Sequence, residues 1–173
     1  MVIMFIVLAC VVLLIGGTGF LLAPRMSGRE RVHPFFGIKW AHRGLHNMKK
    51  GIPENSMKAF QAAVDAGDGI ELDVHLTKDN QIVVFHDDTF ERVCGKKGTV
   101  EETTYTEMKK YFLSGTKERI PLLKDVLKTV DGKVPLLIEV KLPSANTKVC
   151  QRLDEELQGY KGKYMIQSFN SLV

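Results

Sequence analysis

The sequence predicts an α/β fold built on a parallel sheet, either open or closed into a barrel. Two observations lead to this prediction. From residue 37 onward, short apolar runs typical of strands alternate with segments of helical spacing. Polar and charged side chains also gather where these runs end, which is where parallel α/β proteins place their active sites.

The elements follow one another in a regular order. A short strand is expected at 37–41, and a helix at 55–67 has a capping Asn or Ser in front and Gly67 behind. The strand at 69–77 alternates strictly between apolar and polar residues. Further strands are expected at 82–87, 134–141 and 164–169, and further helical segments at 104–114, 121–130 and 144–160.

The first 23 residues carry no charge and are almost entirely apolar. As a helix they would extend about 35 Å, enough to cross a hydrocarbon core of roughly 30 Å. A cleaved signal peptide would need a basic n-region and a shorter apolar run, so residues 1–23 are predicted to be an uncleaved transmembrane anchor. Because Arg25, Arg29 and Arg31 follow the run, we expect a single-pass protein of the cell membrane with its C-terminal domain on the cytoplasmic side.

Charge and cysteine content exclude several classes of protein. The chain has 24 Lys and Arg against 20 Asp and Glu, and the basic residues are dispersed, so no nucleic-acid partner is expected. Cys10, Cys94 and Cys150 are isolated from one another. Neither a zinc site nor a disulfide framework is therefore indicated.

Three carboxylates stand on strands that are otherwise apolar. Glu71 and Asp73 are two residues apart, so they point to the same face of their strand. That pattern alone also suits a solvent-facing strand of an antiparallel sheet. Glu139, on the polar face of a second apolar strand, favours convergence of all three at one end of a parallel sheet. Oxygen ligands without cysteine favour a hard divalent cation, namely Mg²⁺, Ca²⁺ or Mn²⁺.

Two histidines end predicted strands near these carboxylates. His42 follows the strand at 37–41, and His86 lies near the end of the strand at 82–87. A lone histidine at such a place is more often structural, but two beside a metal site are suited to proton transfer in both directions. Arg43 and Lys141 would add positive charge for a phosphate. Gly44 would let the backbone pass close to a substrate.

Six sequence motifs resemble those of a known family. The motifs are "AHRG" (41–44), "PENSMKAF" (53–60), "GIELDVHLTKDNQIVVFHDDTFERVCGKKG" (69–98), "IPLLKDVL" (120–127), "LLIEVK" (136–141) and "QSFN" (167–170). Their order and spacing resemble the glycerophosphodiester phosphodiesterase family, a branch of the phospholipase-C-like TIM-barrel phosphodiesterases.

The resemblance implies a (β/α)8 TIM-barrel fold, of which about the first five βα units are present. Residues 24–37 would be a juxtamembrane linker, residues 38–173 a partial, C-terminally truncated domain, and residues 88–118 a small insertion over the barrel mouth. The site residues that it implies are His42 and His86 as general acid and base, Arg43 and Lys141 at the phosphate, Glu71, Asp73 and Glu139 at the metal, and Glu54 at the metal or beside it.

The leading functional hypothesis is metal-dependent hydrolysis of glycerophosphodiesters to glycerol 3-phosphate and an alcohol. One alternative is a lysophospholipase D that acts on membrane lysolipids. Another is a non-catalytic truncated membrane protein or pseudoenzyme. The expected partners are a small-molecule glycerophosphodiester or lysolipid and, through the N-terminal helix, a membrane.

Overall fold

A computed structural model describes residues 2–22, 29–144 and 146–170, and the chain divides into two compact units, Met1–Phe36 and Gly37–Val173. The first unit holds two helices and a 3-10 turn: α1 (Val2–Leu22), α2 (Arg29–Val32) and η1 (His33–Phe35). Part of the predicted 24–37 linker, residues 24–28, lies outside the described residues.

The prediction of a membrane anchor at residues 1–23 is corrected by the structure. Residues Val2–Leu22 of this segment form the helix α1. However, no helix among the described residues is both long enough and apolar enough to cross a membrane. The predicted transmembrane anchor and single-pass membrane localisation are therefore wrong.

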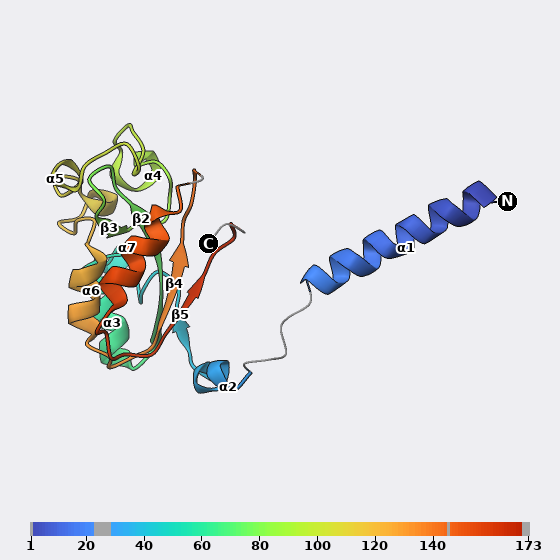
Figure 1. Cartoon of the computed structure of the whole chain (residues 1–173). Coiled ribbons are helices and arrows are strands. Elements are labelled where there is room, and N and C mark those ends of the chain that lie inside the picture. Colours follow the sequence, from blue (N-terminus) through green and yellow to red (C-terminus); the bar gives the residue numbers. More distant parts are fainter. Residues whose placement is uncertain (1, 23–28, 145, 171–173) are drawn as a thin grey trace. The chain divides into compact units, whose positions relative to one another are not determined.

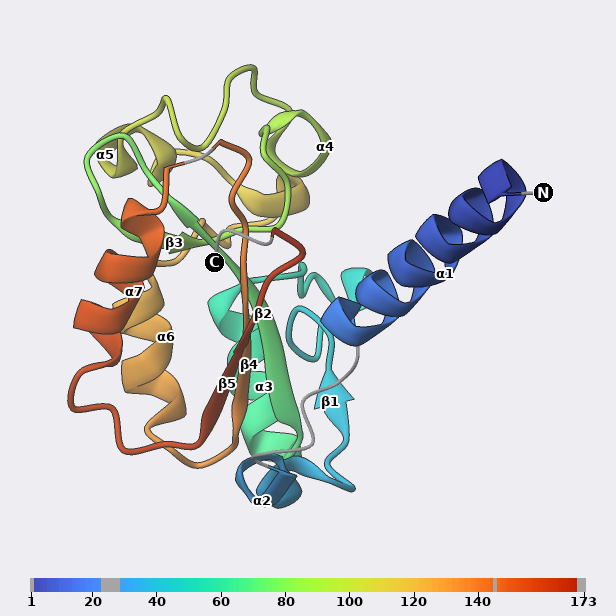
Figure 2. The same cartoon turned by 45° about the vertical axis from the view of Figure 1, so that its right-hand side comes forward.

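The second unit is built on a sheet whose main strands are parallel and follow chain order (Figure 1). These strands are β1 (Trp40–Ala41), β2 (Gly69–Leu76), β4 (Leu136–Val140) and β5 (Tyr164–Gln167), and each lies beside the one before it. Three helices connect them: α3 (Met57–Ala66), α6 (Leu123–Val130) and α7 (Lys148–Leu157). All three lie on one side of the sheet (Figure 2). Strands in chain order with helices on one face are typical of a barrel-type winding.

The two faces of β2 differ as the alternation of its sequence predicts. Ile70, Leu72 and Val74 are fully buried against the helices, together with apolar residues of β4. Glu71 and Asp73 point to the opposite face. Every residue of β2 is buried, so the polar side chains of this strand have little access to solvent. The apolar face forms the core, and the polar face is left for a site.

One predicted strand runs in the opposite direction to its neighbour. β3 (Ile82–Val84) pairs antiparallel with the end of β2, with Val74 opposite Val84. A parallel crossover needs about a dozen residues or more, but only residues 77–81 separate the two strands. The described residues of the second unit therefore form four parallel strands and a hairpin strand, not five successive βα units.

The segment after β3 forms a small core of its own. Its fully buried residues include Phe90, Met108 and Leu113, which pack with Phe85. The short elements here are α4 (Glu91–Cys94), α5 (Tyr105–Met108) and η3 (Leu113–Gly115), and the loop after β1 adds the 3-10 turn η2 (Met48–Lys50). The expected helix at 104–114 is thus limited to one turn.

The short α5 has a local cause. Phe112 leaves the helical path to form an antiparallel bridge with Arg119, whose guanidinium also lies 4.5 Å from the centre of the Phe112 ring. Ser114 adopts a left-handed backbone with φ 48°, which no α-helix accommodates. Tertiary pairing therefore overrides the helical spacing of the sequence.

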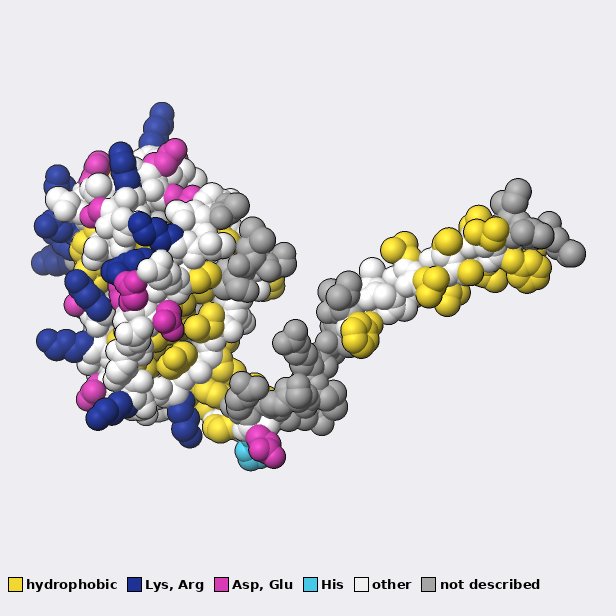
Figure 3. All heavy atoms as spheres, viewed as in Figure 1, with side chains coloured by type: hydrophobic (Ala, Val, Ile, Leu, Met, Phe, Trp, Pro, Cys, Tyr) yellow, Lys and Arg dark blue, Asp and Glu magenta, His cyan; other side chains and the backbone are white. Residues whose placement is uncertain are grey.

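β5 forms the outer strand of the sheet. Apolar side chains gather on the surface over β5 and α7 (Figure 3). Tyr164 and Ile166 of β5 are exposed, and a mostly apolar groove of about 290 Å³ lies between β5 and α7, also lined by Leu153 and Leu157. The packing of the sheet against its helices is therefore tighter at β2 and β4 than at this edge.

We expect Leu72→Ala to lower the free energy of unfolding by about 2–5 kcal/mol, because it leaves a cavity where sheet and helices meet. Urea unfolding of the chain measures this change. Lys128→Ala, on the exposed side of α6, is the control and should stay within about 0.5 kcal/mol of the original chain. Equal effects of the two substitutions would contradict the central position of Leu72.

Candidate active site

The register of the parallel strands brings acidic and polar side chains into one row. Asp73 of β2 lies opposite Glu139 of β4, and Glu139 lies opposite Gln167 of β5. The Gln167 side-chain amide donates to Glu139 Oε2 at 3.4 Å. Glu71 stands two residues before Asp73 on the same face. The polar face of the sheet therefore gathers three carboxylates at the carboxyl ends of its strands, as predicted.

These three carboxylates form a compact, buried cluster. One oxygen of each of Glu71, Asp73 and Glu139 lies within 4.8 Å of those of the other two. Burial, with a further contribution from the charge of Asp73, raises the pKa of Glu71 to about 7. Like charges at this spacing destabilise one another unless a cation compensates them.

The cluster fits a divalent cation. Hard cations such as Mg²⁺ and Ca²⁺ prefer several carboxylate oxygens, and the three residues supply them from two adjacent strands. Asp73 Oδ1 is buried and accepts no hydrogen bond among the described residues, although the Lys141 ammonium lies 3.0 Å away. The structure thus brings together Glu71, Asp73 and Glu139, the three residues predicted at the metal.

Glu54, which the resemblance puts at the metal or beside it, binds arginine in this structure. Its Oε1 accepts hydrogen bonds from Arg43 Nη1 at 3.0 Å and from Arg92 Nη2 at 2.6 Å. Burial opposes the ionisation of Glu54, but its bonds and charge interactions with the two arginines prevail and lower its pKa. Glu54 therefore binds two arginines, and one of them, Arg43, contacts the acidic cluster.

Both predicted phosphate-binding residues lie at the cluster. Lys141 donates to Glu139, and these contacts hold its ammonium between two of the three carboxylates. The Arg43 backbone N–H donates to Glu71 Oε2 at 2.9 Å, and its Nε lies 3.7 Å from Asp73 Oδ2. The buried Arg43 Nε has no hydrogen-bond partner among the described residues.

The two predicted acid–base histidines lie on different segments beside the cluster. His42 follows β1, has a largely exposed side chain, and places Nε2 4.0 Å from Glu71 Oε2. His86 follows β3, where the Phe85 backbone N–H donates to the Asp73 carbonyl at 2.9 Å. Its Nδ1 lies 2.7 Å from Asp87 Oδ1, an arrangement in which Nδ1–H donates to the carboxylate and Nε2 is left free.

Gly44 allows a close contact within the chain. Its φ is +78°, and a Cβ at this position would lie 2.8 Å from the Cβ of Ala59 and 3.0 Å from Phe60. Gly44 therefore allows the turn after β1 to pack directly against α3. The expected close approach of its backbone to a substrate stays a prediction.

Several residues that sequence reasoning passed over support the predicted ones. Asn55 donates to Asp73 Oδ2 at 2.9 Å. Its place in the motif "PEN", directly after Glu54, was the sequence feature that could have pointed to it. Asp87 reads as a turn former in sequence, yet it binds both His86 and Arg92. No local pattern pointed to Arg92, because its partner Glu54 is 38 positions away.

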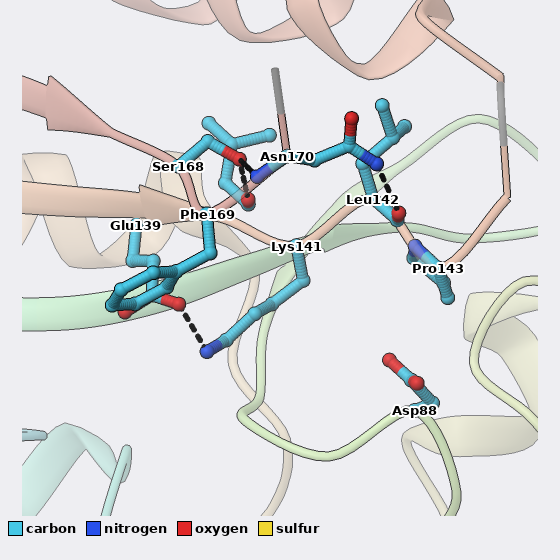
Figure 4. Close-up of a pocket in the computed structure, with 9 residues that line it drawn as sticks. Asp88, Glu139, Lys141, Leu142, Pro143, Ser168, Phe169 and Asn170 are labelled. Carbon is cyan, nitrogen blue, oxygen red and sulfur yellow. Dashed lines mark hydrogen bonds and ion pairs between the residues drawn. The ribbon is translucent and has the colours of Figure 1, made fainter. Parts of the chain in front are cut away.

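A pocket of about 460 Å³ opens at the carboxyl ends of β4 and β5 (Figure 4). Glu139 and Lys141 line it together with Phe169 and the exposed Asp88. Ser168, another lining residue, donates from Oγ to the Val140 carbonyl at 2.8 Å, which holds the turn after β5 against β4. The pocket therefore places open volume directly beside one carboxylate of the cluster and the lysine.

The fold and this site match known proteins. A solved structure of an Oleispira antarctica phosphodiesterase in complex with the product sn-glycerol-3-phosphate superposes with a TM-score of 0.72, at 25% identity, over 82% of this chain and 61% of that one. The glycerophosphodiester phosphodiesterase of Caldanaerobacter subterraneus subsp. tengcongensis is 38% identical over 143 residues, which cover 75% of this chain and 57% of the relative. The rat lysophospholipase D GDPD1 is 33% identical over 174 residues, which cover 90% of this chain and 54% of that protein.

The family model matches most of the second unit. The chain spans little more than half the length of these two curated relatives. The model of the glycerophosphoryl diester phosphodiesterase family matches residues 42–171, a range that contains every residue of the site described above. The chain therefore belongs to the glycerophosphoryl diester phosphodiesterase family.

Proposed function

We propose that the site belongs to a metal-dependent phosphodiesterase that hydrolyses glycerophosphodiesters to glycerol 3-phosphate and an alcohol. The observation that carries this proposal is the buried cluster of Glu71, Asp73 and Glu139 with two basic side chains, Arg43 and Lys141, in contact with it. Family membership and the glycerol-phosphate complex of the Oleispira relative support the same class of substrate.

The cation is proposed to be Mg²⁺, Ca²⁺ or Mn²⁺, held by Glu71, Asp73 and Glu139. When bound, such an ion compensates the charge of the carboxylates and of a phosphate that approaches them. The guanidinium of Arg43 and the ammonium of Lys141, which both lie at the cluster, would bind phosphate oxygens from the protein side. These contacts hold the phosphorus in place and stabilise the charge that develops on its oxygens.

The proton transfers are assigned to His42 and His86. One imidazole accepts a proton from water as the water oxygen bonds to phosphorus, and the other gives a proton to the alcohol oxygen as the P–O bond breaks. The free Nε2 of His86 and the exposed ring of His42 leave both groups accessible to a substrate. A neighbouring glycerol hydroxyl could attack in place of water, and the same two histidines would then transfer the protons.

A second candidate is cleavage of the headgroup from a lysophospholipid. Three mammalian relatives carry the name lysophospholipase D GDPD1, and they match 86–90% of this chain at 31–33% identity. The bond that such an enzyme breaks is also a phosphodiester to an alcohol. The same residues would therefore act, and only the group attached to the glycerol would differ.

We expect His42→Ala and His86→Ala each to lower the turnover of glycerophosphocholine by at least about 100-fold, because each removes a proton-transfer group. Affinity for Mg²⁺ or Ca²⁺, measured by calorimetry, should not change. His46→Ala, an exposed histidine in the nearby loop, is the matched control and should keep full activity. Retained activity in either of the first two variants would exclude that residue from the mechanism.

We expect the chain to hydrolyse glycerophosphocholine faster than lysophosphatidylcholine when both are offered at equal concentration with the cation. Release of choline measures both reactions. A clear preference for the lysolipid would favour the second candidate. Absence of turnover with both substrates, together with absence of cation binding, would leave a non-catalytic protein.

Stability should depend on pH through Glu71. The folded chain keeps a proton on Glu71 up to a pKa of about 7, whereas the unfolded chain releases it near 4.5. Without a cation, the free energy of unfolding should therefore fall between pH 4.5 and 7, by up to about 3 kcal/mol. Saturating Mg²⁺ should reverse this loss because it binds the ionised cluster.

Urea unfolding at a series of pH values, compared with Glu71→Gln, isolates this contribution. The variant has no proton to release at this position, so its stability should not share the decline, and Mg²⁺ should stabilise it less. Parallel pH curves for the two proteins would refute the prediction.

A further inference from the structure

Arg92 joins two parts of the site that lie on separate segments. It belongs to α4, in the segment that follows β3. Its Nε and Nη2 donate to Asp87 Oδ2 and Oδ1 at 2.6 and 2.8 Å, and its Nη2 also donates to Glu54 Oε1 at 2.6 Å. One guanidinium thus holds two carboxylates, and each of these contacts a different residue of the proposed mechanism.

Through Asp87, Arg92 is connected to His86. Asp87 Oδ1, which Arg92 holds, lies 2.7 Å from His86 Nδ1. The hydrogen bond from Arg92 is the main reason that the pKa of Asp87 is lowered to about 2, so this residue stays a carboxylate. A carboxylate can only accept at Nδ1, which keeps a proton on the Nδ1 of His86 and leaves Nε2 as the ring nitrogen for proton transfer.

The backbone of His86 is held as well. His75 of β2 is fully buried, and its Nε2 lies 3.3 Å from the His86 carbonyl oxygen. The carbonyl can only accept, so Nε2–H of His75 donates to it. The position of the His86 backbone is therefore determined by the sheet, and the rotation of its ring depends on Asp87.

Through Glu54, Arg92 is connected to Arg43. Glu54 Oε1 accepts from both Arg92 Nη2 and Arg43 Nη1. A second, longer bond from Arg92 Nη1 to Glu54 Oε2, at 3.3 Å, holds the other oxygen of the same carboxylate. The Arg43 guanidinium, whose Nε faces the acidic cluster, is thus oriented by a carboxylate that Arg92 keeps in place.

We infer that Arg92 is a positioning residue that sets the ring of His86 through Asp87 and the guanidinium of Arg43 through Glu54. The inference rests on the proposed function for the meaning of these two residues, but its geometry is independent of that function. One arginine from outside the sheet would in this way align the proton-transfer group and the phosphate-binding group together.

Steady-state kinetics of the full chain distinguish the contacts to His86 through Asp87 from the contacts to Arg43 through Glu54. Asp87→Ala should lower kcat by about 10- to 100-fold with KM within about twofold, because a misplaced proton-transfer group acts on the reaction itself. Glu54→Ala should mainly raise KM, by about 10-fold, because Arg43 is no longer held toward the phosphate. Arg92→Gln should both lower kcat and raise KM. Adding Arg92→Gln to Asp87→Ala should lower kcat no further, since both substitutions disrupt the same contacts that orient His86.

A spectroscopic measurement tests the geometry without any substrate. In ¹⁵N spectra of the imidazoles, assigned by comparison with His86→Gln, His86 should be in the Nδ1–H form. Arg92→Gln and Asp87→Ala should each give a mixture of the two tautomers. Arg92→Lys should restore only part of the original state, because an ammonium cannot fork onto two carboxylates.

Arg152→Gln is the matched control. Arg152 is also a partly exposed arginine in an ion pair, with Glu155 on α7, and it makes no contact with the site residues above. About half of the Arg92 side chain is exposed, so neither change should unfold the chain, which circular dichroism checks.

Unchanged kcat, KM and His86 tautomer in Arg92→Gln would overturn the inference, as would equal changes in Arg152→Gln. Failure of the proposed function has a different signature. If the original chain hydrolyses no glycerophosphodiester, the His86 tautomer alone decides whether Arg92 positions this ring.

Discussion

The constraint on which the rest of the site depends is the burial of three carboxylates on one face of a sheet. Removing charged groups from water is costly unless opposite charges and hydrogen bonds compensate them. Here the Lys141 ammonium contacts Asp73 and Glu139, and the backbone of Arg43 donates to Glu71. A shift of β4 by one residue would turn Glu139 into the helix-covered core. The register that buries the apolar face is thus the register that assembles the cluster.

The chain between β1 and α3 is shaped around these carboxylates. Arg43 and Asn55 both adopt left-handed backbone conformations, with φ 56° and 50°, which are uncommon for residues other than glycine. Each donates a hydrogen bond to the cluster, Arg43 to Glu71 and Asn55 to Asp73, and the Asn55 N–H donates to the Arg43 carbonyl at 2.9 Å. The hydrogen bonds to buried charges offset the backbone strain. Directly after Asn55, Ser56 caps α3 by accepting from the Ala59 N–H, so the helix begins where the site ends.

The sequence was most informative where one periodicity governs a whole element. The alternation of 69–77 predicted both faces of β2, and the order of strands and helices predicted the parallel sheet. It was less informative where contacts outside a periodic segment decide. The short helix α5 ends because Phe112 pairs with Arg119. The contacts of Glu54 could not be predicted because Arg92 meets it only in the folded chain. The antiparallel direction of β3 was within reach, since the short turn at 77–81 excludes a parallel crossover.

The charges connected by the ion pairs of the site explain why a divalent cation suits it. The pairs join five carboxylates, of Glu54, Glu71, Asp73, Asp87 and Glu139, with three basic side chains, of Arg43, Arg92 and Lys141. With all five carboxylates ionised, as a bound cation would keep them, and both histidines neutral, this network carries a net charge of −2, which one divalent cation would balance. A phosphodiester then adds a single negative charge. One protonated histidine restores neutrality, and this is the state that the proposed reaction needs, with one imidazolium as acid and one neutral imidazole as base. Because uncompensated charge is costly in a buried site, this charge balance is the reason that a divalent cation suits the cluster.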